Sequence, residues 1–356
     1  MAKLPAYVIR TTFFAMLAGV GGLWLLQMVF AYLGELENIN DGYTLSHALS
    51  YIFYRSPYFL GQFIPTGVLL GAVVGLSLLS GSSEIVVMRA AGISLLRIIG
   101  WVMMPALLFV ALALAVNQWL LPTATVHAHA IKNPKDALVS IDGYWAVMPN
   151  DAGGRQIVRI GHADSEGNLL DIKRFDDKDG MLGAVLVAKS GNYTGDDDSY
   201  TWQLSDVNWL TLDGQAQTHQ SADLSLTLPI NKSSVHLLTR EAEDLSISEL
   251  YAHGQLMKHQ QTTSKRHQLA FWQKLLSPLS VLSLLLVACS FVFGSLRSQS
   301  MGFRVVLALL TGLLFSYLQD LSGFVALATG LSPFLMVLLP ILLSGVIGLY
   351  LLNKKS

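Results

Sequence analysis

The chain alternates between long apolar runs and polar stretches, and this alternation sets its organisation. A helix needs about 20 mostly apolar residues to cross the hydrocarbon layer of a membrane. Six runs reach this length, at residues 11–33, 58–79, 98–121, 269–293, 302–321 and 333–352. The polar stretch between the third and fourth runs is too long to be a loop. The pattern predicts a polytopic α-helical membrane protein with three transmembrane helices on each side of an inserted soluble domain.

The inserted domain has the pattern of a β-structure. Short runs with apolar alternation or β-forming residues lie at 156–160, 169–174, 184–190, 201–212 and 221–228. Gly, Asp and Asn turn signals separate them at roughly ten-residue spacing, which is typical of a sandwich or jelly roll. Residues 246–265 are predicted to form a helix that returns to the membrane. We therefore assign residues 1–121 to the first three spans, 122–266 to a jellyroll-like all-β domain with this return segment, and 267–356 to the last three spans.

Composition indicates that the chain lies in a membrane, and the distribution of charge predicts its orientation there. The chain is 52% hydrophobic and 13% charged, whereas soluble domains are about 25% charged. Its net charge of −1 argues against a nucleic-acid partner. Basic residues beside short loops stay on the cytoplasmic side, and one side collects Lys3, Arg10, Arg89, Arg97, Arg297, Arg304, Lys354 and Lys355. The other side has Arg55 with Glu35, Glu37, Asp41 and Asp320, so we expect cytoplasmic chain ends and an exported inserted domain.

A charged stretch at residues 80–97 interrupts the apolar runs on the cytoplasmic side. Glu84, Val87, Met88 and Ala91 are spaced to share one face of a short helix, with Glu84 in the first turn, where the helix dipole favours an anion. Such a helix can dock into a groove of a soluble protein. It can also lie at the membrane interface, and spacing alone favours this second interpretation.

No enzyme signature accompanies this architecture. The sequence has no G-x-x-x-x-G-K-[ST], H-E-x-x-H, C-x-x-C or G-x-S-x-G motif, so it cannot hydrolyse ATP by a P-loop of its own. His127 and His129 lack further ligands, and no metal site is predicted. The spans carry few charges, and Asp320 lies near the exported end, so an ion-coupled carrier is disfavoured. A transporter built this way needs an energy source on another chain.

A second group of charges lies near the exported membrane surface. It comprises Arg55, Lys132, Lys135, Lys258, Lys265 and Arg266. Attraction to anionic lipid headgroups explains such residues at about 1 kcal/mol each, and composition alone favours that interpretation. The alternative is the capture of a phosphorylated lipid that leaves the bilayer.

Four segments, in order and spread over the whole chain, resemble the lipopolysaccharide export permeases of the LptF/LptG family. They are Ser83-Glu-Ile-Val-Val-Met-Arg-Ala-Ala-Gly92, Pro65-x5-Gly71-x3-Gly75, Arg266-His-x4-Trp272-x-Lys274-Leu-x2-Pro278-Leu and Phe293-Gly-x-Leu-Arg297-x4-Gly302-x-Arg304. The Glu-Ile-Val-Val-Met stretch is more similar to the G branch than to the F branch.

The resemblance implies a complex in the inner membrane of a Gram-negative bacterium. Two six-span permeases, F and G, would enclose a cavity, and a cytoplasmic dimer of the ATPase LptB would drive them. This chain would hold no cofactor, since ATP and magnesium bind the ATPase. The periplasmic jellyroll domains would pass lipopolysaccharide on through LptC and LptA, and the single span of LptC would pack at a gate beside the first span of G.

The resemblance also implies roles for individual residues. Residues 82–92 would be the coupling helix, with Glu84, Val87, Met88, Arg89 and Ala91 meeting LptB. Family members often place lysines for the lipid phosphates where this chain has Glu35-Leu36-Glu37 and Pro57-Tyr58, which leaves Arg55, Lys265 and Arg266 as the candidates. From their depth near the exported side, we expect Gln27, Phe30, Phe63 and Thr66 at the cavity wall, with plain helix packing as the alternative.

The predicted function is that of a permease subunit that extracts lipopolysaccharide from the inner membrane and delivers it to a periplasmic bridge. Three alternatives remain at this stage: the F-type paralogue, a permease for another lipid or for lipoproteins, and a membrane scaffold that anchors a periplasmic β-domain. An anchor needs a single span, so six predicted spans argue against the scaffold.

Overall fold

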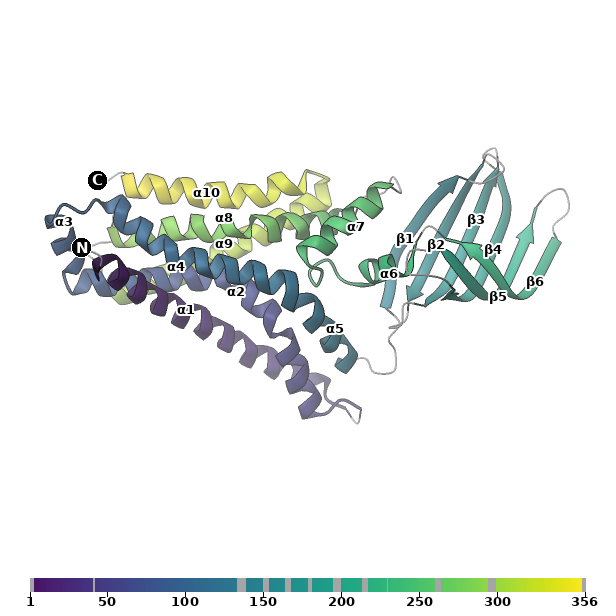
Figure 1. Cartoon of the computed structure of the whole chain (residues 1–356), viewed down its shortest axis with the longest axis horizontal. Helices are drawn as coiled ribbons and strands as arrows, with labels where there is room; N and C mark the ends of the chain where they lie inside the picture. The colour runs from purple at the N-terminus through teal and green to yellow at the C-terminus, as the bar shows by residue number, and fades with distance from the viewer. Residues whose placement is uncertain are drawn as a thin grey trace. The chain divides into compact units, whose positions relative to one another are not determined.

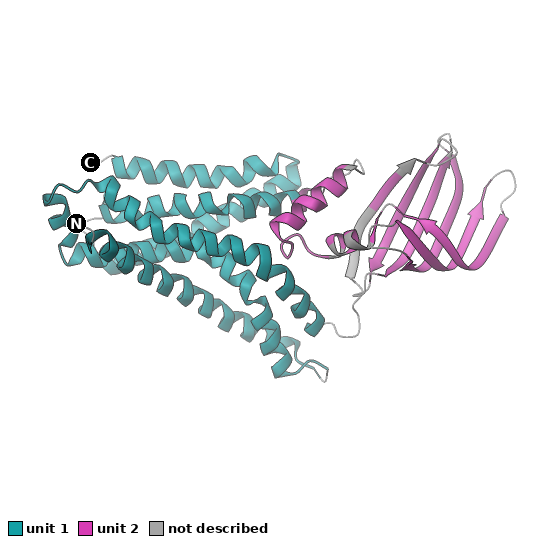
Figure 2. Ribbon diagram, in the orientation of Figure 1, with its two compact units in different colours: residues 1–132, 268–356 teal, residues 133–267 magenta. Residues whose placement is uncertain are grey.

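The computed structural model describes residues 3–40, 42–132, 139–149, 154–163, 168–178, 181–194, 200–212, 217–228, 230–259, 264–293 and 299–353. Its contacts divide the chain into two compact units (Figure 2). Unit 1 is helical and consists of Met1–Lys132 and Gln268–Ser356, whereas unit 2, Asn133–His267, contains the β-structure.

The prediction of six long apolar helices is confirmed. Within the described residues, six helical stretches are long and apolar enough to cross a membrane: Lys3–Asn38, Leu45–Gly81, Leu95–Lys132, Lys265–Phe293, Met301–Thr329 and Pro333–Asn353. They contain α1 (Lys3–Glu35), α2 (Leu45–Gly81), α4 (Leu95–Ala115), α5 (Leu121–Lys132), α8 (Lys265–Phe293), α9 (Met301–Thr329) and α10 (Pro333–Asn353), shown in Figure 1. Most of them extend beyond the apolar runs, because polar residues at the ends continue the helices.

The third span continues beyond the residue at which the sequence pattern ends. A π-helical turn, Val116–Leu120, follows α4, and α5 then runs to Lys132. Pro122 does not stop it, because a π-helical turn lies directly before it and adjusts the backbone where the proline ring and the missing N–H would otherwise interrupt the helix. Residues 122–132, which the sequence pattern assigned to the inserted domain, therefore belong to this helix and to unit 1.

Glycines bring α1 and α2 into backbone contact. A Cβ atom added to Gly71 would lie 2.2 Å from Met16 Cα, and one added to Gly67 would lie 2.6 Å from Val20 Cα. A Cβ atom added to Gly75 would lie 3.0 Å from Thr12 Cα. This four-residue spacing of glycines is the small-residue pattern by which membrane helices pack closely. The N-terminal half of α1 is thereby fixed on α2.

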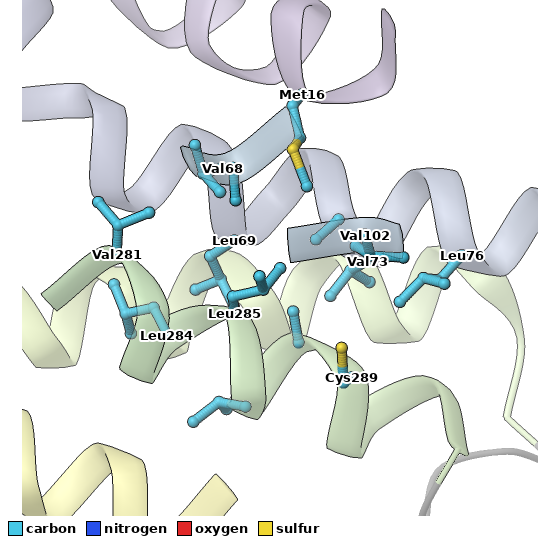
Figure 3. Packing of buried hydrophobic residues seen from close by; sticks show 14 of the residues in the cluster. Met16, Val68, Leu69, Val73, Leu76, Val102, Val281, Leu284, Leu285 and Cys289 are labelled. Carbon is cyan, nitrogen blue, oxygen red and sulfur yellow. The ribbon is translucent and has the colours of Figure 1, made fainter. Parts of the chain in front are cut away.

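The core of unit 1 contains residues of α1, α2, α4, α8, α9 and α10. Figure 3 shows Met16 of α1 reaching the valines and leucines of α2, with Val102 of α4 and Leu285 of α8 completing the layer. Cys289, the single cysteine of the chain, is fully buried here and serves as a packing residue. Outer faces of α1, α9 and α10 keep large apolar side chains exposed, as expected for helices that contact lipid or another membrane subunit.

Unit 2 is built on one antiparallel sheet with its described strands in consecutive order. These are β1 (Val139–Pro149), β2 (Arg155–Ala163), β3 (Leu169–Lys178), β4 (Met181–Tyr193), β5 (Thr201–Thr211) and β6 (Gln217–Thr227). The prediction of a jellyroll-like all-β domain is confirmed. The described strands of this domain form a single six-stranded sheet. β1 was missing from the predicted strands because Asp142-Gly143 has the pattern of a turn, and the register of β1 against β2 shifts between Ser140 and Tyr144, across that dipeptide.

Two short helices follow the sheet. α6 (Lys232–Thr239) was not predicted, and α7 (Ile247–His259) lies in the predicted segment 246–265. Ser246 starts α7 with a capping box, in which its hydroxyl accepts from Glu249 N–H at 3.2 Å and Glu249 Oε2 accepts from Ser246 N–H at 2.7 Å. Residues 260–263 of the predicted helix lie outside the described residues.

The inward and outward alternation of the sheet reverses along one row of residues, which we call the phase line: Gly161, Asp171, Lys189, Asp206 and Ala222. On one side of it the buried row is Ile160, Ile172, Ala188 and Val207, and on the other side it is Ala163, Leu169, Gly191 and Leu204. Two residues per strand, rather than one, separate these buried rows.

Two aspartates make this reversal possible without a change of strand pairing. Asp171 has a φ of 52° and Asp206 one of 54°, the left-handed conformation that Asp tolerates better than most residues. Strand partners keep the same register on both sides of the phase line. Gly161 is required beside it, since a Cβ atom there would lie 2.8 Å from Asp171 Oδ2. The buried face thus continues across the line.

Candidate functional site

The short helix predicted at 82–92 is present as α3 (Glu84–Ala90). It lies at the end of the bundle where α1 begins and α10 ends (Figure 1). Ser83 turns the chain into α3 with a left-handed φ of 59°, and Gly92 leaves it with a φ of 83°. Glu84 occupies the first turn, as predicted, where the partial positive charge of the helix N-terminus stabilises its carboxylate.

The rotation of α3 follows from its two buried residues. Ile85 and Met88 are 6% and 3% exposed and join the core of unit 1. Val86 and Val87 are 49% and 66% exposed on the other side, and Arg89 and Ala91 are exposed as well. Met88, which the spacing placed with the docking residues, therefore faces the bundle.

Val86 takes its place on the exposed face and was missed by the sequence reasoning. The signal that could have found it is the apolar pair Ile85 and Met88, since residues three apart share a face and a larger aliphatic pair favours burial.

The two oxygens of the Glu84 carboxylate have different surroundings. Tyr7 of α1 donates its hydroxyl hydrogen to Glu84 Oε1 at 3.1 Å. Glu84 Oε2 is shielded from solvent and accepts no hydrogen bond from the described part of the chain. Nothing in the local sequence pointed to Tyr7, because the two residues meet only through the packing of α1 against α2.

The residues expected at the cavity wall occupy different environments. Phe30 of α1 is 61% exposed, while Gln27 and Phe63 are half-buried. Thr66 is buried against α9, since a Cβ atom added to Gly312 would lie 2.5 Å from Thr66 Cγ2. Thr66 therefore takes the helix-packing role that was the alternative.

The basic residues near the other end of the bundle are already engaged. The guanidinium of Arg55 lies 4.7 Å from the centre of the Tyr58 ring. Lys132, at the end of α5, forms an ion pair of 2.9 Å with Glu35 at the end of α1 and also lies 4.9 Å from the centre of the Tyr51 ring.

Glu35 is the buried member of the pair with Lys132, with 9% of its side chain exposed. Burial, and then the charge of Glu35, raise the pKa of Tyr43 in the loop between α1 and α2, so its hydroxyl stays protonated. In the sequence, Glu35 and Lys132 were only separate charges on the side predicted to be exported.

Bases in unit 2 are more accessible. Arg266 contacts Glu243 at 3.5 Å and Glu241 at 3.6 Å, and these side chains are about half exposed, so the pairs contribute little to stability. Lys258 and Lys265 are exposed. Lys135 and, among the bases used for orientation, Arg297, Lys354 and Lys355 lie outside the described residues.

A histidine pair joins α7 to the start of α8 within unit 2. The rings of His253 and His267 stack with centroids 3.7 Å apart and an interplanar angle of 10°. Burial lowers the pKa of His253 to about 4, with a smaller contribution from His267. His253 is therefore neutral at neutral pH. Ser264 Oγ lies 2.7 Å from His267 Nδ1 and fixes that ring.

His127 and His129, the histidines weighed as metal ligands, do not form such a site with their neighbours. The ring of His127 packs on Tyr54 with centroids 5.2 Å apart. Across the part of the chain that the structure describes, His, Cys, Asp and Glu side chains form no group of three or more that could hold a metal ion.

The comparisons with known proteins cover nearly the whole chain. A family model described as "Lipopolysaccharide export system permease LptF/LptG" matches residues 6–354. The "Lipopolysaccharide export system permease protein LptG" of Escherichia coli strain K12 is 29% identical over 360 residues, which cover 99% of this chain and 98% of that protein. The protein of the same name from Haemophilus influenzae is 27% identical over 362 residues, with the same coverage of 99% and 98%.

Proposed function

Since the chain belongs to the LptF/LptG family of lipopolysaccharide export system permeases, we propose that it is the G-type permease of a complex that lifts lipopolysaccharide out of the bacterial inner membrane. Both ends of the chain and α3 then face the cytoplasm, and the β-sheet of unit 2 faces the periplasm. The names of the relatives from Escherichia coli and Haemophilus influenzae support the G-type assignment.

The observation that carries the mechanism is α3. It presents a carboxylate and the exposed apolar side chains Val86 and Val87, while Ile85 and Met88 fasten it to the bundle. A soluble protein with a groove would bind this helix by the apolar face and contact Glu84 with a basic residue. We propose that this protein is the ATPase LptB, with ATP and magnesium bound there, because this chain has no P-loop motif.

Extraction of the lipid from the membrane requires energy because its acyl chains are buried in the bilayer. Each methylene held in the bilayer contributes about 0.8 kcal/mol, so a lipid with many chains does not leave spontaneously. ATP binding would close the ATPase dimer, pull the two coupling helices together and narrow the cavity between this chain and an F-type partner. Gln27, Phe30 and Phe63 would line that cavity, with Arg55 and Arg266 near the lipid phosphates.

The β-sheet would receive the displaced lipid. Its inner face carries Trp202, Leu204 and Val207, which are almost fully buried, and Trp202 donates its indole N–H to Ile230 O at 2.8 Å. These side chains pack in the core of unit 2, so acyl chains would contact them only after this core opens, and an apolar face would then shield the chains from water. LptC and then LptA would take the lipid onward.

The test of the docking role is Glu84→Ala in the complete complex. We expect the affinity for the ATPase to fall about tenfold or more, since a charged residue of the ATPase is left unpaired. Lipopolysaccharide transport should be lost, while the permease still inserts into the membrane. Co-purification of the ATPase and transport are measured side by side. Arg97→Ala, on α4 at the same end of the bundle, is the matched control. Wild-type amounts of bound ATPase on the Glu84→Ala variant would contradict the proposal.

A further inference from the structure

The carboxylate of Glu84 is held by a residue from a separate helix. Tyr7, in the first turns of α1, donates its hydroxyl hydrogen to Oε1 over 3.1 Å. The Tyr7 side chain is 47% exposed, whereas Val8 beside it is fully buried against the bundle. Tyr7 therefore lies at the rim of the bundle, and its ring bridges α1 and α3.

The other oxygen of this carboxylate has no donor among the described residues. Glu84 Oε2 is enclosed and accepts no hydrogen bond from any residue that the structure describes. An ionised carboxylate accepts at both oxygens, and an enclosed acceptor without a donor raises the free energy of the folded state. Because Oε2 has no solvent-exposed surface, a donor of a second protein would reach it only after the carboxylate rotates or α3 shifts, and a cationic N–H would then form the strongest such bond.

The attachment of α1 gives the Tyr7 hydrogen bond a mechanical consequence. The covalent chain joins α3 to α2 and α4, and the Tyr7 bond adds α1. The cytoplasmic half of α1 is fixed on α2 by Gly67, Gly71 and Gly75, which leave no space for a Cβ atom. A displacement of α3 through Glu84 is thus passed to α1 and α2 together, rather than to α2 alone.

We propose that Tyr7 is a positioning residue for the ATP-driven movement. Its hydroxyl fixes the orientation of the Glu84 carboxylate, which an arginine or lysine of the ATPase then contacts, and it couples the motion of α3 to α1. The inference rests on the proposed function, in which the ATPase docks on α3.

The test is Tyr7→Phe in the purified complex reconstituted into membranes with its ATPase. The ring remains, so the bundle keeps its packing, and only the hydroxyl is lost. We expect the ATPase to co-purify and hydrolyse ATP, while the lipopolysaccharide released per ATP falls about tenfold, the effect of losing one hydrogen bond to a charged group. Tyr317→Phe removes an exposed hydroxyl from α9 and is the matched control, with the wild-type ratio expected.

A double-mutant cycle separates positioning from a general structural effect. If Tyr7 acts through Glu84, then Tyr7→Phe causes no further loss in a Glu84→Gln background. An additional tenfold loss in that background, or a wild-type ratio for Tyr7→Phe alone, overturns the inference. Failure of the docking proposal gives a different result, because the Glu84→Gln variant would then bind the ATPase and transport lipopolysaccharide in response to ATP as the wild type does.

Discussion

The ion pair of Lys132 with Glu35 changes the role that the sequence suggested for Lys132. Lys132 was grouped with bases that attract phosphate, yet it is the partner of a carboxylate that the fold buries. A buried carboxylate without its counter-ion is costly, whereas exposed ion pairs contribute little. We therefore assign Lys132 first to the attachment of α1 to α5.

Replacing Lys132 by Ala should lower the free energy of unfolding by about 3 kcal/mol, since Glu35 is left buried without a counter-charge. Thermal unfolding of the detergent-solubilised protein measures the loss. The matched control is Lys189→Ala, which removes a pair of 4.0 Å between side chains that are 80% and 72% exposed and should leave the melting temperature unchanged. Glu35→Gln in the Lys132→Ala background should recover part of the loss, and no recovery would argue against burial as the cause.

His253 gives the fold a defined dependence on pH. Its folded pKa of about 4 lies below the unfolded value of about 6.5. The unfolded chain therefore takes up the proton first as the pH falls. The stability from the neutral, stacked ring is complete above pH 6.5 and is lost as the pH falls toward 4.

Lowering the pH from 7.5 to 5 should therefore cost wild-type protein about 2 kcal/mol more than a His253→Phe variant, which keeps a flat aromatic ring and has no proton to bind. Denaturant unfolding of both proteins at the two pH values measures the difference. Parallel losses in the two proteins would show that His253 does not titrate in this range.

At the scale of elements, the helices were accessible to prediction because a span has a simple requirement of length and apolarity. The capping box of α7 and the left-handed Gly92 after α3 were equally local. The rotation of α3 was missed although the apolar pair Ile85 and Met88 is a local signal for it. What local pattern could not supply is the partner of Glu84, which comes from α1 and meets it only through helix packing.

The contact of α1 with α2 leads to a prediction at this scale. Gly71→Ala should destabilise unit 1 by about 2 kcal/mol or more, because the new Cβ atom would lie 2.2 Å from Met16 Cα and backbone would have to move. Gly100→Ala, in a helix with open space around it, should be neutral or stabilising by up to about 1 kcal/mol, from helix propensity. Thermal unfolding of the two variants in detergent measures the difference. Equal melting temperatures would mean that α1 and α2 can move apart at no cost in stability.

At the scale of the whole molecule, the layout of three spans, an inserted β-domain and three spans followed from the sequence. The described strands 2 to 6 of the sheet were found by alternation and turn residues. β1 was lost because a dipeptide that signals a turn lies inside a strand, where a bulge absorbs it. The ion pair of Glu35 with Lys132 and the stacking of His253 on His267 join distant positions of the chain. No local pattern encodes them.

The phase line also limits how this sheet can vary. A strand that gained or lost a single residue between the Asp171–Asp206 level and its turn would place its remaining apolar side chains in water and its polar ones inside. Each strand is therefore bound to the lengths of its neighbours, and changes of length are expected to collect in the turns. A natural or engineered variant of this domain would have to shift several adjacent strands at once, or none.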